Sequence, residues 1–139
     1  MLILHGAPAL SDFRLLKYVS ALRRRHTGVA AVAARFVHFV DLQRELEPAA
    51  RVVLERLLTY GPALAAAPVQ GRLVLVVPRP GTLSPWSSKA TDIAHVCGLT
   101  AVRRIERGIA WTIGGIDELD WAGLRALAEP LHDRMTEAL

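Results

Sequence analysis

The sequence contains only one cysteine, Cys97, which excludes an internal disulfide and any metal site built from several thiolates. No apolar run approaches the roughly 18–20 residues that cross a bilayer, and the N-terminus lacks the basic and apolar blocks of a secretory signal. Charged residues make up 22% of the chain and apolar residues 52%, a balance that excludes intrinsic disorder. We therefore expect one soluble, cytoplasmic domain of 139 residues, with no membrane partner and no structural metal.

Lysine is scarce, although the chain is basic. Arginine supplies 15 of the 17 cations, 13 acidic residues are interleaved with them, and the net charge is +4. Only Arg23–Arg25 forms a basic run, at the end of a predicted helix, where cations favour the negative end of the helix dipole. The basic charge suggests a nucleic-acid-binding module as an alternative, but such modules gather cations and exposed aromatic side chains on one face. We expect no nucleic-acid partner.

Hydrophobic periodicity predicts alternating strands and helices in the first half of the chain. Phe36, His38 and Val40 recur at period two, as in a strand, whereas Phe13 and Leu16 follow helical spacing. The predicted elements are a strand over 1–5, a turn over 6–8, a helix from the N-cap Ser11 to His26, a strand over 29–42, a helix from Pro48 to Gly61, and a connector over 63–71.

The second half repeats this alternation with one additional strand. The predicted elements are a strand over 73–77, a loop over 78–85, a helix from about Ser88 to Gly98, two strands over 100–107 and 109–113 around Gly108, and a helix that starts near Asp117 or Asp120. Pro130 should kink or split the last helix, because its ring clashes with the preceding turn. Met135 is assigned to the apolar side of that helix.

The repeated order divides the chain into two halves, about 1–70 and 71–139. Each half is too small to cover the face of a sheet alone. We therefore predict one α+β domain, with helices packed on a largely antiparallel sheet and with two pseudo-symmetric halves.

The sequence lacks the common catalytic signatures. It has no Gly-x-Gly-x-x-Gly motif, and residues 81–89 lack the second glycine of a phosphate-binding P-loop. Cys97 lies in an apolar stripe and is predicted to be a buried structural thiol, while His38 is predicted to be a satisfied core or interface histidine. No pair of acidic residues suits general acid–base work. We predict no catalytic residue and no metal ligand in this chain.

Residues 78–93, PRPGTLSPWSSKATDI, are the most informative segment. The free N–H groups and the positive dipole end of a helix start at Ser87–Lys89 suit an anion such as phosphate or carboxylate. Trp86, in a loop stiffened by proline, suits a docking surface. Asp92 suits a helix cap or an ion pair with Lys89. A capped helix start with a packed tryptophan and a small phosphate-binding domain both remain open alternatives.

The same segment carries a family resemblance. PRPGTLSPWSSKATDIAHVCGL (78–99) and VRRIERGIAW (102–111) closely resemble the N-terminal region of the large, single-chain phosphoribosylformylglycinamidine synthases of purine biosynthesis. The remaining matching segments, in the same order, are LHGAPALSDFR (4–14), FVHFVDL (36–42), ERLLTYGPAL (55–64) and LHDRMTEAL (131–139). The sequence departs from the family pattern at Val96, often Asn in the family, and at His5, often Arg.

The resemblance implies a domain of a longer ligase. The family converts formylglycinamide ribonucleotide (FGAR) to formylglycinamidine ribonucleotide (FGAM) with ATP, magnesium and the amide nitrogen of glutamine. Catalysis belongs to synthetase and glutaminase regions outside these 139 residues, so the isolated chain is expected to be inactive and to bind no cofactor. In the family this domain resembles a dimer of the separate small subunit of the three-protein enzyme. Its implied role is architectural, at the synthetase–glutaminase interface and the ammonia path.

The resemblance also directs attention to candidate contact residues. The interface or anion-binding candidates are Arg79, Ser84, Trp86, Ser87, Ser88, Lys89, Thr91 and Asp92. A domain with absent neighbours should expose an apolar patch larger than a monomer normally tolerates. We expect Trp86, Trp111 and Trp121 among its members, and we expect that the isolated domain is able to form a homodimer through it.

Overall fold

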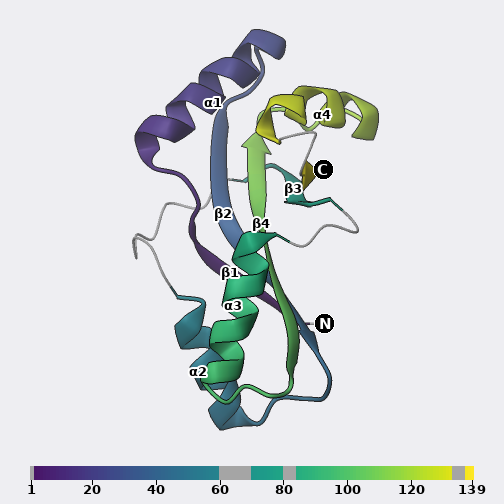
Figure 1. Cartoon of the computed structure of the whole chain (residues 1–139). Coiled ribbons are helices and arrows are strands. Elements are labelled where there is room, and N and C mark those ends of the chain that lie inside the picture. Colours follow the sequence, from purple (N-terminus) through teal and green to yellow (C-terminus); the bar gives the residue numbers. More distant parts are fainter. Residues whose placement is uncertain (1, 60–69, 80–83, 133–136) are drawn as a thin grey trace.

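The computed structural model describes residues 2–59, 70–79, 84–132 and 137–139. Its elements are β1 (Leu2–Pro8), α1 (Asp12–Arg25), β2 (Ala31–Leu42), α2 (Pro48–Leu57), β3 (Arg72–Pro78), α3 (Pro85–Val96), β4 (Val102–Gly114), α4 (Trp121–Ala128), the 3-10 turn Glu129–Leu131, and β5 (Glu137–Ala138). The strands form one antiparallel sheet in the order β1-β2-β4-β3-β5, and four helices pack against it (Figure 1). The predicted α+β class is confirmed.

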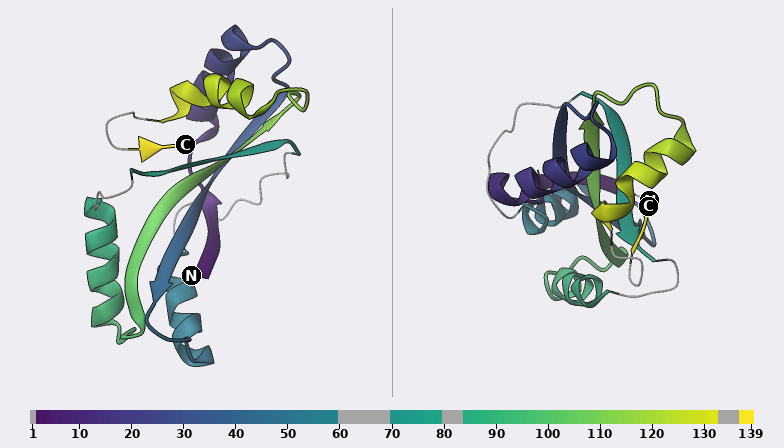
Figure 2. Two further views of the ribbon diagram at one scale, coloured as in Figure 1. Left: turned by 90° about the vertical axis from the view of Figure 1, so that its right-hand side faces the viewer. Right: turned by 90° about the horizontal axis from the view of Figure 1, so that it is seen from above.

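The long strands β2 and β4 form the centre of the molecule. They pair from Ala31 and Gly114 at one end to Leu42 and Val102 at the other, with a register shift after Asp41. Helices α1 and α4 lie at the first end and α2 and α3 at the second, so the molecule is elongated along this twisted pair (Figure 2). Each end has its own buried apolar cluster.

The two apolar clusters share one face of the sheet. The cluster beside α1 and α4 contains Val32, Val74 and Trp111, and the cluster beside α2 and α3 contains Val40 and Ile105. Strand side chains alternate between faces, so the intervening residues point to the opposite side. On that opposite side the large apolar side chains of Ile3, Leu73 and Leu75 are exposed.

The helix boundaries follow local signals closely. The Ser11 side chain accepts a hydrogen bond from the Arg14 N–H at the start of α1, and α2 begins at Pro48, both as predicted. Asp120 caps α4, and Pro130 lies in a 3-10 turn that follows the helix, so the predicted split is confirmed. The connector over 63–71 falls largely outside the described residues, and Met135 lies outside them.

Two predicted breaks in strands are wrong. Gly6–Pro8 is not a turn but the end of β1, which has a register shift between His5 and Pro8. β1 is an edge strand of the sheet, where a proline without an N–H is tolerated. Likewise, residues 102–114 form one strand through Gly108. A Cβ at Gly108 would lie 2.8 Å from the Val76 carbonyl oxygen, so this glycine permits close packing rather than marking a break.

The order of strands places β1 and β3 outside β2 and β4. The first half of the chain thus contributes β1 and β2 and the second half contributes β3, β4 and β5, although a symmetry that relates the halves stays a prediction. Trp111, expected on the surface, is instead 2% exposed and packs edge-on against Tyr18 with ring centroids 5.1 Å apart. The described residues contain no helix that is long and apolar enough to cross a membrane.

The arginine run at the end of α1 is not simply solvated. Arg23 donates hydrogen bonds to the Val29 and Ala30 carbonyl oxygens, and Arg25 donates one to the Ala126 carbonyl oxygen. These bonds tie the end of α1 to the start of β2 and to α4. All three arginines are exposed in the last turn of α1, as the sequence predicts for cations at this end of a helix, and these bonds add a structural role to two of them.

Candidate functional site

The candidate residues concentrate on α3, which begins three residues earlier than predicted. The Ser84 hydroxyl accepts a hydrogen bond from the Ser87 N–H at 3.0 Å, and Pro85 occupies the first helical turn. Serine is a favoured N-cap and proline a favoured first residue, so both local signals place the start at Pro85 and not at Ser88. The predicted helix end at Gly98 is confirmed by its positive φ of 84°.

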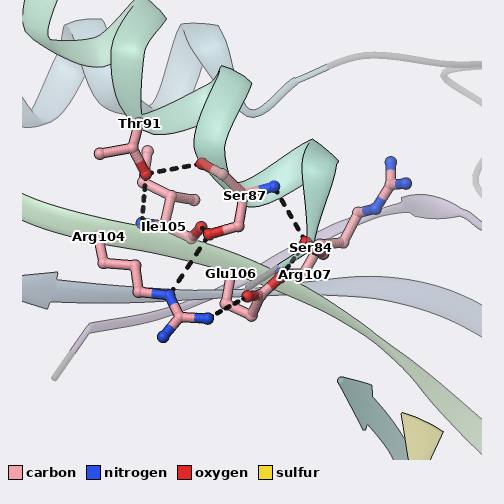
Figure 3. Close-up of polar contacts among 7 residues, drawn as sticks. All are labelled: Ser84, Ser87, Thr91, Arg104, Ile105, Glu106 and Arg107. Atoms are coloured by element: carbon pink, nitrogen blue, oxygen red, sulfur yellow. Dashed lines mark hydrogen bonds and ion pairs between the residues drawn. The ribbon is translucent and has the colours of Figure 1, made fainter. Parts of the chain in front are cut away.

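One face of α3 covers the edge of β4 with polar side chains (Figure 3). The Ser87 hydroxyl donates to the Ile105 carbonyl oxygen at 2.5 Å, and the Thr91 hydroxyl accepts from the Ile105 N–H at 3.1 Å. One turn further, the His95 Nε2 lies 2.7 Å from the Val102 carbonyl oxygen. Within the described residues β3 pairs with β4 over 109–113, and at Ile105 and Val102 side chains of α3 supply bonds of the kind that a neighbouring strand provides.

A charged pair extends this network at the start of α3. The Arg104 guanidinium lies 2.7 Å from the Glu106 carboxylate and donates a longer bond, 3.4 Å, to the Ser87 hydroxyl. The Ser84 hydroxyl and the Arg107 N–H both donate to the same carboxylate, at 2.9 and 3.2 Å. Glu106 is therefore held as a structural acceptor at the junction of α3 and β4 (Figure 3).

Aromatic rings and a guanidinium stack beside this network. The Arg107 guanidinium lies 4.5 Å from the Phe36 ring centroid and 4.6 Å from the Trp86 ring centroid, close enough for cation–π attraction to both. Trp86 also stacks on His38 with centroids 5.7 Å apart. The predicted core location of His38 is confirmed, since its side chain is buried.

The buried environment changes the acidity of His38. Burial, followed by the nearby Arg107 charge, lowers the pKa of the His38 imidazole from 6.5 to about 4, although hydrogen bonding with the Leu4 backbone opposes this. His38 is consequently neutral near pH 7. A neutral imidazole in this position completes the packing of Trp86 without adding a second positive charge beside Arg107.

The eight predicted candidates separate into two groups. The inward group, whose hydrogen bonds or ring contacts join α3 to the sheet, contains Ser84, Trp86, Ser87 and Thr91. The exposed group contains Arg79, Ser88, Lys89 and Asp92. Lys89 and Asp92 form no ion pair in the described part of the chain, and the N-cap is Ser84 rather than Asp92.

Sequence reasoning missed the residues on the strand side of this site. Arg104, Glu106, Arg107 and Phe36 belong to different segments from the helix that they support. The spacing of Ser87, Thr91 and His95 by four residues placed these side chains on one helix face, and that spacing was an available signal. The alternating charges of residues 103–107 gave no indication of their partners.

The site offers positioning more than reaction chemistry. Within the described ranges, no three or more histidine, cysteine, aspartate or glutamate side chains gather as a possible metal site. Cys97 is exposed at the C-cap of α3, so the prediction of a buried thiol is wrong. The helix ends at Val96, so Cys97 does not continue the buried apolar side of α3 that the sequence pattern indicated.

A hollow between α1 and α4 is separate from this site. It measures about 260 Å³ and is lined by Arg25, His26, Leu119, Gly123, Ala126 and Leu127. The His26 Nε2 lies 3.2 Å from the Glu118 carboxylate, and its Nδ1 accepts the Gly28 N–H at 3.0 Å. These contacts connect the turn after α1 to the segment before α4.

The chain matches the model of a known protein family. The family model described as "Formylglycinamide ribonucleotide amidotransferase N-terminal" matches residues 35–139, about three quarters of the sequence. The matched region includes α3 and β4, and hence the whole network around Ser87 and Glu106. Residues 4–14, which also carry the resemblance, precede the matched region.

Proposed function

The chain belongs to the N-terminal family of formylglycinamide ribonucleotide amidotransferases, and from that membership we propose that it is a scaffold and interface domain of its parent enzyme. The family is part of phosphoribosylformylglycinamidine synthase, a ligase-type amidotransferase of purine biosynthesis. We propose that the domain lies against the synthetase and glutaminase regions of the parent chain and completes their interface and the ammonia path. It would thereby support the ATP- and glutamine-dependent conversion of FGAR to FGAM without a reaction of its own.

The observation that carries the proposal is the amount of apolar surface left uncovered. The exposed large apolar side chains include Ile3, Phe13, Leu16, Leu73, Ile93, Val96 and Trp121. Two of the exposed pairs, Phe13 with Leu16 on α1 and Ile93 with Val96 on α3, are three residues apart and so share one helix face. Adjacent exposed apolar side chains of this kind commonly mark contact sites. We propose that residues 86–92 lie near the junction with the catalytic regions, because α3 exposes polar side chains there and continues into the exposed apolar side chains of Ile93 and Val96.

The chemistry of the described residues supports an auxiliary role. Glu106 is engaged by Arg104, and Asp41 lies 3.5 Å from Arg103, so both acids have cationic neighbours. We propose that ATP and magnesium bind to other regions of the parent enzyme and that the isolated domain is inactive. In isolation, its uncovered apolar surface is free to pair with a second copy, and this homodimer stays a prediction.

Reconstitution in trans tests the proposal. The purified 139-residue chain should hydrolyse neither ATP nor glutamine, and its addition to a parent enzyme that lacks this domain should restore part of the glutamine-dependent formation of FGAM. The measurement is the ratio of product formed to glutamine consumed. Glutaminase activity in the isolated chain, or reconstitution that fails although the two pieces bind each other, would contradict the scaffold role.

A further inference from the structure

A groove between α2 and α3 is not explained by the fold. Its volume is about 160 Å³, and its lining residues are Leu57, Leu58, Trp86, Lys89, Ala90, Ile93 and Ile105. Leu58 and Ile105 are buried and belong to the apolar cluster beside α2 and α3, so the groove extends down to that cluster. Small-molecule sites usually start at about 300 Å³, so this groove has the size for one side chain rather than a nucleotide.

The walls of the groove are held in place before any partner binds. Ser87 and Thr91 anchor α3 to the Ile105 backbone through hydrogen bonds. Trp86, Ala90 and Ile93 recur at helical spacing and form the neighbouring face of the helix, which lines the groove. A preformed pocket avoids part of the entropic cost of ordering on binding.

The groove also carries a positive charge at its edge. Lys89 is the one charged residue in its lining, is exposed, and takes part in no ion pair within the described ranges. It lies in the second turn of α3, which begins at Pro85. Ile93 in the lining is 44% exposed, and Val96 beyond the groove is 88% exposed, which continues the apolar surface along the helix.

We propose that this groove binds one apolar side chain of a neighbouring protein region, and that a carboxylate next to that side chain pairs with Lys89. The proposal rests on the scaffold function and identifies the partner as an acidic segment with a protruding leucine-like side chain. This partner complements the groove in shape and charge. Leu58 and Ile105 form an apolar floor for its side chain, and Lys89 at the edge attracts its carboxylate.

A titration with small probes tests the chemistry directly. N-acetyl-leucine combines an apolar side chain with a carboxylate, whereas N-acetyl-leucinamide lacks the charge. In nuclear magnetic resonance titrations both should shift the signals of Leu57, Ala90 and Ile93, and the carboxylate should bind about two- to five-fold more tightly, as one exposed ion pair allows. Lys89→Gln should abolish this difference in affinity. The control is Lys17→Gln, which changes the second lysine of the chain, on α1, and should preserve the difference.

The opposing outcomes are equally definite. Absence of saturable shifts, equal affinity for the two probes, or an unchanged preference in Lys89→Gln would overturn the proposal. In the reconstitution assay, Lys89→Glu should weaken assembly and Lys17→Glu should not. If Lys89→Glu and Ile93→Ala both reconstitute activity as well as the native chain, the groove is not part of the interface, although the scaffold role stands. Failure of the groove proposal is therefore distinguishable from failure of the scaffold proposal.

Discussion

At the scale of single residues, the burial of His38 changes the protonation of its side chain. Its imidazole stacks on Trp86, and the Arg107 guanidinium lies over the same tryptophan. Burial first and the Arg107 charge second lower the pKa of His38 to about 4. The folded protein therefore binds this proton less readily than the unfolded chain, in which the pKa is close to 6.5.

This difference predicts that acid weakens the fold. Above pH 6.5 the contribution of His38 is fully present, and it decreases as the pH falls towards 4, because the unfolded state then binds the proton. Between pH 7.5 and pH 5 we expect a loss of about 2 kcal/mol in the free energy of unfolding from this residue. Urea denaturation at both pH values measures it.

The comparison that isolates His38 uses a variant that cannot titrate. His38→Gln should lower the free energy of unfolding at both pH values. The decrease in that free energy from pH 7.5 to pH 5 should, however, be about 2 kcal/mol smaller in the variant than in the native chain. The other four histidines remain in both proteins. An identical pH dependence in the two proteins would show that His38 is not the titrating group.

At the scale of elements, α3 is unusual because a polar face joins it to the sheet. Ser87 and Thr91 bond both the C=O and the N–H of Ile105, and His95 reaches the Val102 carbonyl oxygen. The edge of β4 below its pairing with β3 is therefore covered by side chains of a helix. This arrangement satisfies backbone groups that would cost free energy if buried without partners.

Hydrogen exchange at Ile105 tests this arrangement. In Thr91→Val the Ile105 N–H loses its acceptor at 3.1 Å, so we expect faster exchange of that amide and a loss of about 1–3 kcal/mol in the free energy of unfolding. Thr91→Ser retains the hydroxyl and serves as the control, with exchange close to that of the native chain. If Thr91→Val leaves the protection of Ile105 unchanged, the hydroxyl does not hold this strand edge.

At the scale of the whole molecule, two apolar clusters are joined by the same pair of strands. One cluster contains Trp111, and Trp86 packs against the other. Because β2 and β4 run through both ends (Figure 2), neither cluster can lose its strands without affecting the other. We therefore expect the domain to unfold as one cooperative unit, as single domains of this size commonly do.

Fluorine labelling can follow both ends in one experiment. With 5-fluorotryptophan incorporated at its three tryptophans, the protein should show native signals for Trp86 and Trp111 that disappear with the same midpoint in urea. Trp121, which is exposed, should change its chemical shift least on unfolding. Two separate midpoints would mean that the ends of the sheet are independent folding units.

Local signals predicted much of the fold. Ser11, Pro48 and Asp120 indicate helix starts through chemistry that acts within a few residues, and period-two alternation in 29–42 identified β2. The candidate site was only partly predictable, because Ser87 and Thr91 were recognised as notable while their partner Ile105 lies 18 and 14 residues away. Nothing in the local pattern reveals which strand edge a helix covers.

The sequence by itself determined the α+β class, the alternation of strands and helices from β1 to α3, and the family resemblance, because these depend on periodicity, caps and a recognisable motif. Tertiary structure alone decided that β4 continues through Gly108, that Trp111 is buried, and that Cys97 is exposed. It also decided which face of α3 meets β4 and which forms the groove. These features depend on packing between segments that are distant in the chain, and such contacts exist only once the sheet has assembled.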